Sequence, residues 1–160
     1  MMQAQVFTLY PDIFPGPLGK GLYGKAMSKK LWSLKVTNIR DAATDRHKTV
    51  DDTPYGGGTG MLLKPDVLAN SIDRNINKGD RILYLSPKGR VFNQKLAQDL
   101  SFEKSFSLIC GHFEGVDERV LSTRNIEEIS VGDYVLSGGE TAALVAVSYT
   151  HLTLPTSDLV

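Results

Sequence analysis

The sequence has little that would tie the chain together covalently or carry it into a membrane. It contains one cysteine in 160 residues, which excludes an internal disulfide framework and a metal site of the CxxC type. No apolar run approaches the roughly 20 residues of a membrane-spanning helix, and the first residues hold no apolar segment of a secretory signal. We therefore expect a soluble cytoplasmic protein, with Cys110 as a small core residue inside the apolar stretch 106–110.

A net charge is also absent, but the charges are unevenly spread. Residues 1–50 carry eight Lys or Arg against three acids, whereas residues 101–160 carry three against nine. A basic first third suits a polyanionic partner, and a solvated helix face would explain it equally well. The length and the near-average composition predict one domain with a core of its own.

Apolar patterning predicts an alternation of strands and helices. Runs rich in β-branched and apolar residues predict strands at residues 3–10, 33–41, 81–86 and 105–110, with Pro87 and Gly111 ending the last two. Helical spacing predicts helices at residues 22–33, 65–77 and 93–100, with Pro65 in a first turn and Asn93 as a cap. This order predicts an α/β fold, a mostly parallel sheet flanked by helices.

Three of the expected strand ends are followed by turns that contain glycine or proline. They are "LYLSPKGR" (83–90), "LICGHFEG" (108–115) and "ISVGDYVLSGGE" (129–140). The carboxyl ends of parallel strands meet at one edge of a sheet, so these loops can converge on a ligand held by main-chain groups. The alternative is that the glycines serve only tight turns.

Two other glycine-containing segments resemble nucleotide-binding motifs without matching them. "GKGLYGKA" (19–26) has Ala26 where a phosphate loop needs Ser or Thr, and no buried strand leads into it. "YGGGTGM" (55–61) lacks the third glycine of the dinucleotide fingerprint and follows a polar loop. Neither nucleotide hydrolysis nor a Rossmann-type site is expected.

Four long motifs occur in a characteristic order along the chain. They are "DRHKTVDDTPYGGGTGM" (45–61), "YLSPKGR" (84–90), "CGHFEGVDERV" (110–120) and "SVGDYVLSGGE" (130–140). With the opening "VFTLYPDIFPGPL" (6–18), they closely resemble the bacterial tRNA (guanine-N1)-methyltransferases, the TrmD family of SPOUT methyltransferases. The resemblance implies a SPOUT-type fold with a deep C-terminal trefoil knot, a homodimer, S-adenosyl-L-methionine as cofactor, and methylation of N1 of the guanine 3′ of the anticodon in tRNA.

The resemblance also implies roles for individual residues, none of which is a predicted metal ligand. The cofactor loops would contribute Tyr84, Leu85, Ser86, Pro87, Gly111, Phe113, Glu114, Ser130, Val131, Gly132, Asp133, Tyr134, Val135, Leu136, Gly138 and Gly139. The loop that meets tRNA would contribute Arg46, His47, Lys48, Tyr55, Gly56, Gly57 and Gly58. A solvated histidine is the alternative for His47, and a surface ion-pair cluster is the alternative for Glu114 with residues 117–119. His112 stands where many relatives have arginine.

The C-terminal stretch departs from the family pattern. Residues 148–160 contain no lysine or arginine, include Pro155 and show no helical register, so we expect a non-native or vector-derived tail after a cofactor-binding domain at 1–147. The family's catalytic aspartate, its assisting arginine and its C-terminal tRNA-binding domain are expected beyond residue 147. This polypeptide would then contain no catalytic residue of its own and would bind the cofactor but be catalytically impaired. The alternative is a non-catalytic RNA- or metabolite-binding module.

Overall fold

One parallel sheet forms the centre of the molecule. The computed structural model describes residues 2–52, 62–76, 79–112 and 115–152. The sheet has the order β2-β1-β6-β5-β7, and all its neighbouring strands are parallel. Its strands are β1 (Met2–Thr8), β2 (Trp32–Asn38), β5 (Arg81–Val91), β6 (Ser105–Cys110) and β7 (Glu127–Ser130). The predicted α/β class with a parallel sheet is confirmed, while the trefoil knot stays a prediction.

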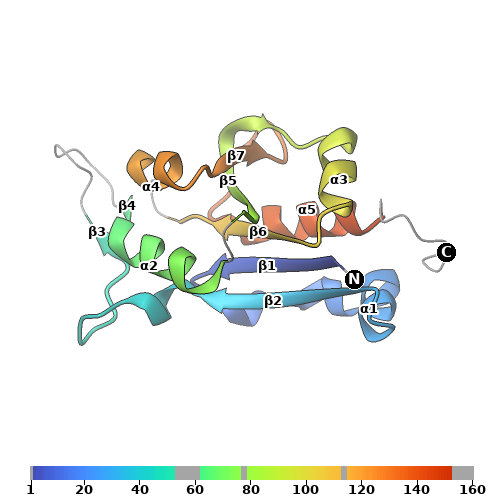
Figure 1. Cartoon of the computed structure of the whole chain (residues 1–160), viewed down its shortest axis with the longest axis horizontal. Coiled ribbons are helices and arrows are strands. Elements are labelled where there is room, and N and C mark those ends of the chain that lie inside the picture. The colour runs from blue at the N-terminus through green and yellow to red at the C-terminus, as the bar shows by residue number, and fades with distance from the viewer. Residues whose placement is uncertain (1, 53–61, 77–78, 113–114, 153–160) are drawn as a thin grey trace.

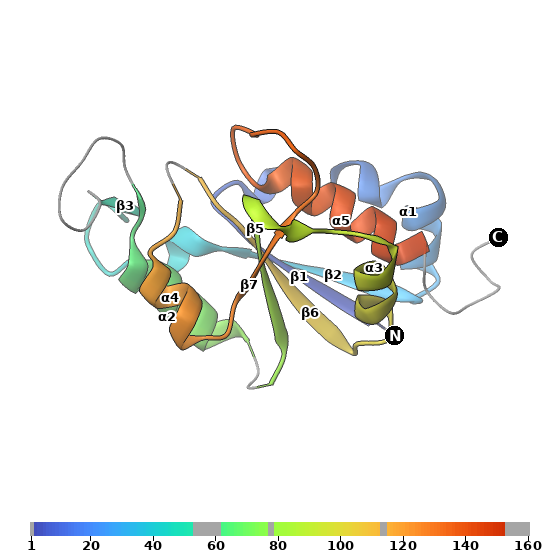
Figure 2. The same ribbon diagram turned by 90° about the horizontal axis from the view of Figure 1, so that it is seen from above.

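Helices cover both faces of this sheet (Figures 1 and 2). One face packs against α2 (Pro65–Asn75), α4 (Glu118–Thr123) and the 3₁₀ turn η3 (Ile39–Ala42). The other packs against α1 (Gly21–Ser28), α3 (Gln94–Ser101) and α5 (Glu140–Leu152). The short 3₁₀ turns η1 (Pro11–Ile13) and η2 (Gly16–Gly19) precede α1, and β3 (Asp51–Asp52) pairs antiparallel with β4 (Leu62–Leu63).

The central strands β1 and β6 are buried on both faces. Val6 and Leu108 belong to the core on the α5 side, and Phe7 and Ile109 belong to the core on the α2 side. All four side chains are fully buried. Strands covered on both faces are expected to read as nearly continuous apolar runs, which is why "SFSLIC" predicted β6 correctly. Cys110 is fully buried, which confirms its prediction as a core residue.

The prediction that Pro87 ends its strand is wrong. The strand β5 continues to Val91, and both Leu85 and Arg90 pair with Ile129 of β7. Residues 86–89 therefore bulge out of the ladder, and a bulge tolerates a proline because no N–H is needed there. The bulge displaces a short polar segment toward the carboxyl edge of the sheet.

Two helix predictions are confirmed and two need correction. Helix α2 begins at Pro65, and the Asn93 side chain caps α3 by accepting a 2.9 Å hydrogen bond from the N–H of Leu96. The helix predicted at 22–33 ends at Ser28, because the chain turns there to begin β2 at Trp32.

The second correction concerns the end of α5. This helix continues through residue 148 to Leu152, so the prediction that residues 148–152 lack helical register is wrong. Ala143, Ala146, Val147 and Thr150 repeat at helical spacing and are buried. This buried stripe explains the extension, because packing outweighs the weak helix propensity of the segment. None of the described helices has both the length and the apolar character that a membrane crossing requires.

Candidate functional site

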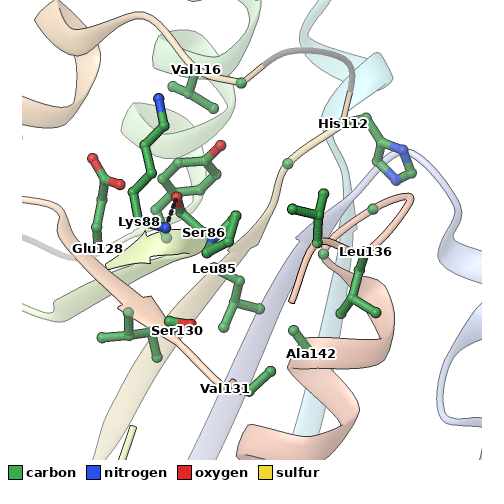
Figure 3. A pocket seen from close by; sticks show the side chains of 18 of the residues that line it. Leu85, Ser86, Lys88, His112, Val116, Glu128, Ser130, Val131, Leu136 and Ala142 are labelled. Atoms are coloured by element: carbon green, nitrogen blue, oxygen red, sulfur yellow. Dashed lines mark hydrogen bonds between the residues drawn. The ribbon is translucent and has the colours of Figure 1, made fainter. Parts of the chain in front are cut away.

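A cavity of about 260 Å³ lies where three neighbouring strands end (Figure 3). Its walls come from the bulge of β5, the segment after β6 and the loop between β7 and α5. Helix α4 and the first turn of α5 complete it. The carboxyl edge of a parallel sheet is the place where α/β proteins usually bind ligands.

Most of the residues predicted to hold a cofactor line this cavity. The lining includes Tyr84, Leu85, Ser86, Pro87, Gly111, Ser130, Val131, Gly132, Tyr134, Val135, Leu136, Gly138 and Gly139. Asp133 does not line it, and Phe113 and Glu114 lie outside the described residues. The structure thus brings the three predicted loops together, and cofactor binding by these residues stays a prediction.

The loop after β7, residues 131–139, is hydrogen-bonded to the chain just after the end of β6. The N–H of Gly139 donates a 3.0 Å hydrogen bond to the carbonyl oxygen of Gly111. A Cβ atom on Gly139 would lie 2.8 Å from Cα of Cys110, a distance that side chains essentially never show. Glycine at this position is therefore required by the close approach of two backbone segments.

The buried carboxylate of Glu140 also connects the end of this loop to β1 and to the segment after β6. Glu140, the first residue of α5, accepts a 2.6 Å hydrogen bond from the hydroxyl of Thr8 at the end of β1. Its other oxygen lies 2.6 Å from Nε2 of His112, just after β6. The Thr8 hydroxyl oxygen in turn accepts a bond from the N–H of Tyr10. A carboxylate in the first turn of a helix is also stabilised by the helix dipole.

The cavity has an apolar end and a charged end. Val131, Leu136 and Ala142 gather at one end in Figure 3, and Lys88 and Glu128 lie at the other. Tyr84 lies in the wall and is 7% exposed. Its burial, with the nearby carboxylates of Glu128 and Glu118, raises the pKa of Tyr84 to about 12. The tyrosine therefore stays a neutral hydroxyl at physiological pH.

Comparison with known proteins shows which family the chain belongs to. The family model described as tRNA (Guanine-1)-methyltransferase TrmD matches residues 2–155. The chain belongs to this family. It is 69% identical over 155 residues to a tRNA (guanine-N(1)-)-methyltransferase of Pelagibacter ubique, covering 97% of this chain and 68% of the relative. It is 52% identical over 153 residues to the protein of that name from Bartonella quintana, covering 96% of this chain and 66% of the relative.

The chain thus spans about two thirds of the length of these TrmD relatives. A third such relative, from Rhizobium etli, is 53% identical over 154 residues, with 96% of this chain and 66% of the relative covered. The family match extends to residue 155 and so passes the point where we expected foreign sequence to begin. The foreign origin of residues 148–160 itself stays a prediction.

The described residues of the segment predicted to meet tRNA, Arg46, His47 and Lys48, do not line the cavity. Arg46, His47 and Lys48 are exposed in a turn between η3 and β3. The carboxylate of Asp45 closes the turn by accepting bonds from the hydroxyl and the N–H of Thr49, at 2.5 and 2.8 Å. These bonds lower the pKa of Asp45. Nζ of Lys48 donates a hydrogen bond to the carbonyl oxygen of Ala43, so this side chain helps to hold the turn together.

The chain returns from this segment to the cavity wall. The N–H of Leu63 in β4 donates a 3.1 Å hydrogen bond to the carbonyl oxygen of Gly115, which lines the cavity. A backbone bridge between Leu63 and Val116 strengthens the link. The predicted residues Tyr55, Gly56, Gly57 and Gly58 lie outside the described residues.

Motif reasoning passed over several residues of the wall. Those not predicted as ligands are Lys88, His112, Gly115, Val116, Glu118, Leu121, Glu128, Ile129, Ser137 and Ala142. Most stand inside or directly beside the family motifs, so position within a motif is the signal that could have found them. Glu128 lines the wall because β7 is an edge strand beside the bulge of β5, which no linear motif reveals.

Asp117 has a structural role at the start of α4. Its carboxylate accepts a 2.8 Å bond from the N–H of Arg119 and two bonds from the Arg119 guanidinium, at 3.0 and 2.8 Å. These bonds hold the pKa of Asp117 below its ordinary value. The expected alternative of an ion-pair cluster is met by Asp117 and Arg119, while Glu114 lies outside the described residues. Among the described residues, no cluster of three or more His, Cys, Asp or Glu is arranged to hold a metal ion.

Proposed function

We propose that residues 1–160 form the S-adenosyl-L-methionine-binding part of a tRNA (guanine-N1)-methyltransferase. The observation that carries the proposal is the three-loop cavity at the carboxyl edge of the sheet, in a chain that belongs to the TrmD family. The methyl acceptor would be N1 of the guanine 3′ of the anticodon. Because the substrate would be tRNA, the protein would work in the cytoplasm.

The shape of the cavity fits the adenosine part of this cofactor. Val131, Leu136 and Ala142 offer an apolar surface to the flat adenine ring, while main-chain groups of the loops can bind its polar edge. The absence of a side chain at Gly111 lets the ring of Tyr84 pack against this part of the wall, because a Cβ atom there would lie 2.7 Å from that ring.

The charge of the cavity also fits a sulfonium cofactor better than a nucleoside triphosphate. In the part of the wall that the structure describes, Glu118 and Glu128 accompany one lysine, Lys88. Carboxylates attract the sulfonium and ammonium groups and repel phosphates. Lys88 could pair with the cofactor's own carboxylate.

Methyl transfer breaks the bond between sulfur and the methyl carbon and forms a bond from that carbon to guanine N1. When bound, the cofactor supplies the methyl group. The N1 proton must pass to a base, because guanine N1 is protonated near neutral pH. Asp117 is engaged by Arg119, and Tyr84 remains protonated, so neither suits this role. Because no residue of 1–147 matches the catalytic aspartate that the family resemblance implies, we propose that residues 1–160, tested alone, transfer the methyl group slowly.

Two partners complete the proposal. Arg46, His47 and Lys48 would contact tRNA phosphates from their exposed turn. A second copy of the chain would cover the apolar tip of the loop at Val135, which is 82% exposed. Sedimentation velocity that gave only a monomer at micromolar concentration would contradict the dimer.

The decisive experiment separates binding from turnover. Calorimetric titration with S-adenosylhomocysteine should show binding, and ATP should bind far more weakly because it brings phosphates to the carboxylates. A single-turnover assay with a labelled methyl donor and unmodified tRNA should then give at least a roughly hundredfold lower rate than a complete TrmD relative, since loss of a general base costs about that much. If neither S-adenosylmethionine nor S-adenosylhomocysteine binds, the proposed site is refuted. Binding by a longer protein that never methylates tRNA would favour the non-catalytic module.

A further inference from the structure

The buried carboxylate of Glu140 connects three elements next to residues that line the cavity. It meets Thr8 at the end of β1 and His112 after β6, and it begins α5 itself. The Glu140 side chain is 5% exposed and that of His112 is 16% exposed. A carboxylate this deeply buried is costly unless each oxygen is hydrogen-bonded, and here each oxygen has a partner.

This pair lies directly against the loop that the proposed function assigns to the cofactor. A Cβ atom on Gly138 would lie 2.3 Å from Cε1 of His112 and 2.8 Å from Oε1 of Glu140. The next residue, Gly139, is bonded to Gly111, the neighbour of His112. His112, Gly138 and Gly139 all line the cavity. The imidazole therefore touches the loop at the point where it joins α5.

We propose that His112 is a positioning residue, which acts through Glu140 to hold the loop 131–139 in the shape that receives the cofactor. The inference rests on the proposed function for its ligand, but the contact itself is independent of any ligand. In this proposal Nε2 of His112 is the donor, because a carboxylate offers only acceptors to a partner at 2.6 Å. The required property is a donor at that place, which an amide can also supply.

The chemistry defines a pair of variants at one position. His112→Leu removes the donor and leaves one oxygen of Glu140 buried without this partner. His112→Gln restores an N–H donor on a flexible side chain of similar reach. Asp80→Ala is the matched control. It removes a 3.0 Å side-chain hydrogen bond between Asp80 and Ser105, which lies at the amino ends of β5 and β6, whereas the cavity lies at their carboxyl ends.

Two measurements on these variants test the proposal. Calorimetric titration with S-adenosylhomocysteine should show affinity lowered at least tenfold in His112→Leu, because a bond to a charged group is lost. His112→Gln should recover most of it, and Asp80→Ala should match wild type. Hydrogen exchange of the peptide covering 131–139, read without ligand, should be faster in His112→Leu and restored in His112→Gln. A cooperative thermal unfolding transition in each variant would show that the fold itself is kept.

The exchange measurement keeps the proposal separate from the identity of the ligand. If wild type fails to bind S-adenosylhomocysteine, the proposed function is wrong, and exchange alone decides whether His112 holds the loop. Wild-type exchange in a folded His112→Leu variant overturns the proposal, and so does a His112→Gln variant as impaired as His112→Leu. If His112→Leu does not fold, Thr8→Val removes the other bond to the same carboxylate and should also speed exchange of the loop; unchanged exchange there overturns the proposal.

Discussion

Gly139 donates its backbone N–H to the carbonyl oxygen of Gly111 over 3.0 Å, and this bond holds the end of the loop 131–139 against the residue that follows β6. The contact brings two main-chain segments so close that Gly139 has no room for a Cβ atom beside Cys110. The glycine-rich sequence "SVGDYVLSGGE" thus serves the packing of a loop on a strand as well as the cavity that the loop lines.

Replacing Gly139 should abolish ligand binding. Gly139→Val would push the loop away from Cys110, because the obstructing atoms belong to backbone that cannot rotate aside. Titration with S-adenosylhomocysteine should show no measurable heat. Gly79→Ala is the control: Gly79 has φ +96 and open space around it, so that variant should lose some stability and keep its affinity. Binding by Gly139→Val within threefold of wild type would contradict the structure of this loop.

Acid should weaken the join between β5 and β7. Arg81 donates two hydrogen bonds to Glu127, at 2.7 and 3.0 Å, and Arg90 adds a third. The hydrogen bond from Arg81 is the main cause that lowers the pKa of Glu127 below its ordinary 4.5. A lowered carboxyl pKa contributes stability above the unfolded-state value, and this contribution is lost as the pH falls through the folded-state value.

Glu127→Gln should therefore reduce the free energy of unfolding by about 1 kcal/mol at pH 7, the upper end for a partly exposed ion pair. The difference from wild type should shrink as the pH falls below 4.5. Thermal unfolding followed by circular dichroism across this range measures both quantities. A difference that stays constant down to pH 3 would contradict the assignment to this carboxylate.

Cys110 should react with thiol reagents only when the fold opens. Its side chain is fully buried, and burial together with the Glu140 carboxylate raises the thiol pKa well above its ordinary value. The reactive thiolate is therefore scarce at pH 8 as well as inaccessible. Ellman's reagent should label the thiol promptly in denaturant and slowly in native buffer, at a rate independent of reagent concentration once opening limits the reaction. Prompt labelling of the native protein would contradict the packing around β6.

Local patterns predicted the central strands and the capped helix α3 because their signals are local. "SFSLIC" is an apolar run bounded by Gly111, and Asn93 stands at a helix start. The bulge at residues 86–89 was not predicted, since it depends on β7 pairing twice through Ile129. The pair of His112 and Glu140 was also not predicted: 28 residues separate them, and only the return of the chain from β7 to the end of β6 brings them together.

The candidate site divides in the same way. Its three loops were foreseen because parallel strands end at one edge, and the family motifs named most of the wall. Glu128 was not, because it reaches the cavity from an edge strand beside the bulge of β5. Its place depends on tertiary packing, which a pattern along the chain does not encode.

The turn at residues 45–49 should contribute to tRNA affinity, and its substitution should leave the affinity for the cofactor unchanged. Arg46 and His47 are exposed, and neither lines the cavity. Lys48 is better left unchanged, because its Nζ holds the turn through Ala43. The double variant Arg46→Ala, His47→Ala should bind tRNA more weakly, while its affinity for S-adenosylhomocysteine should equal that of wild type.

Salt dependence identifies the kind of contact that is lost. Each phosphate contact contributes roughly 0.7 to 0.9 to the slope of log affinity against log salt concentration, so loss of the Arg46 contact should reduce the slope by about that amount. Filter binding of an unmodified tRNA transcript at several salt concentrations measures the slope. Lys29→Ala, Lys35→Ala is the control, because it removes two exposed positive charges that lie outside this turn, one just after α1 and one in β2. An equal loss in both double variants would show that tRNA responds only to overall charge, and no loss in the Arg46, His47 variant would place the tRNA on another surface.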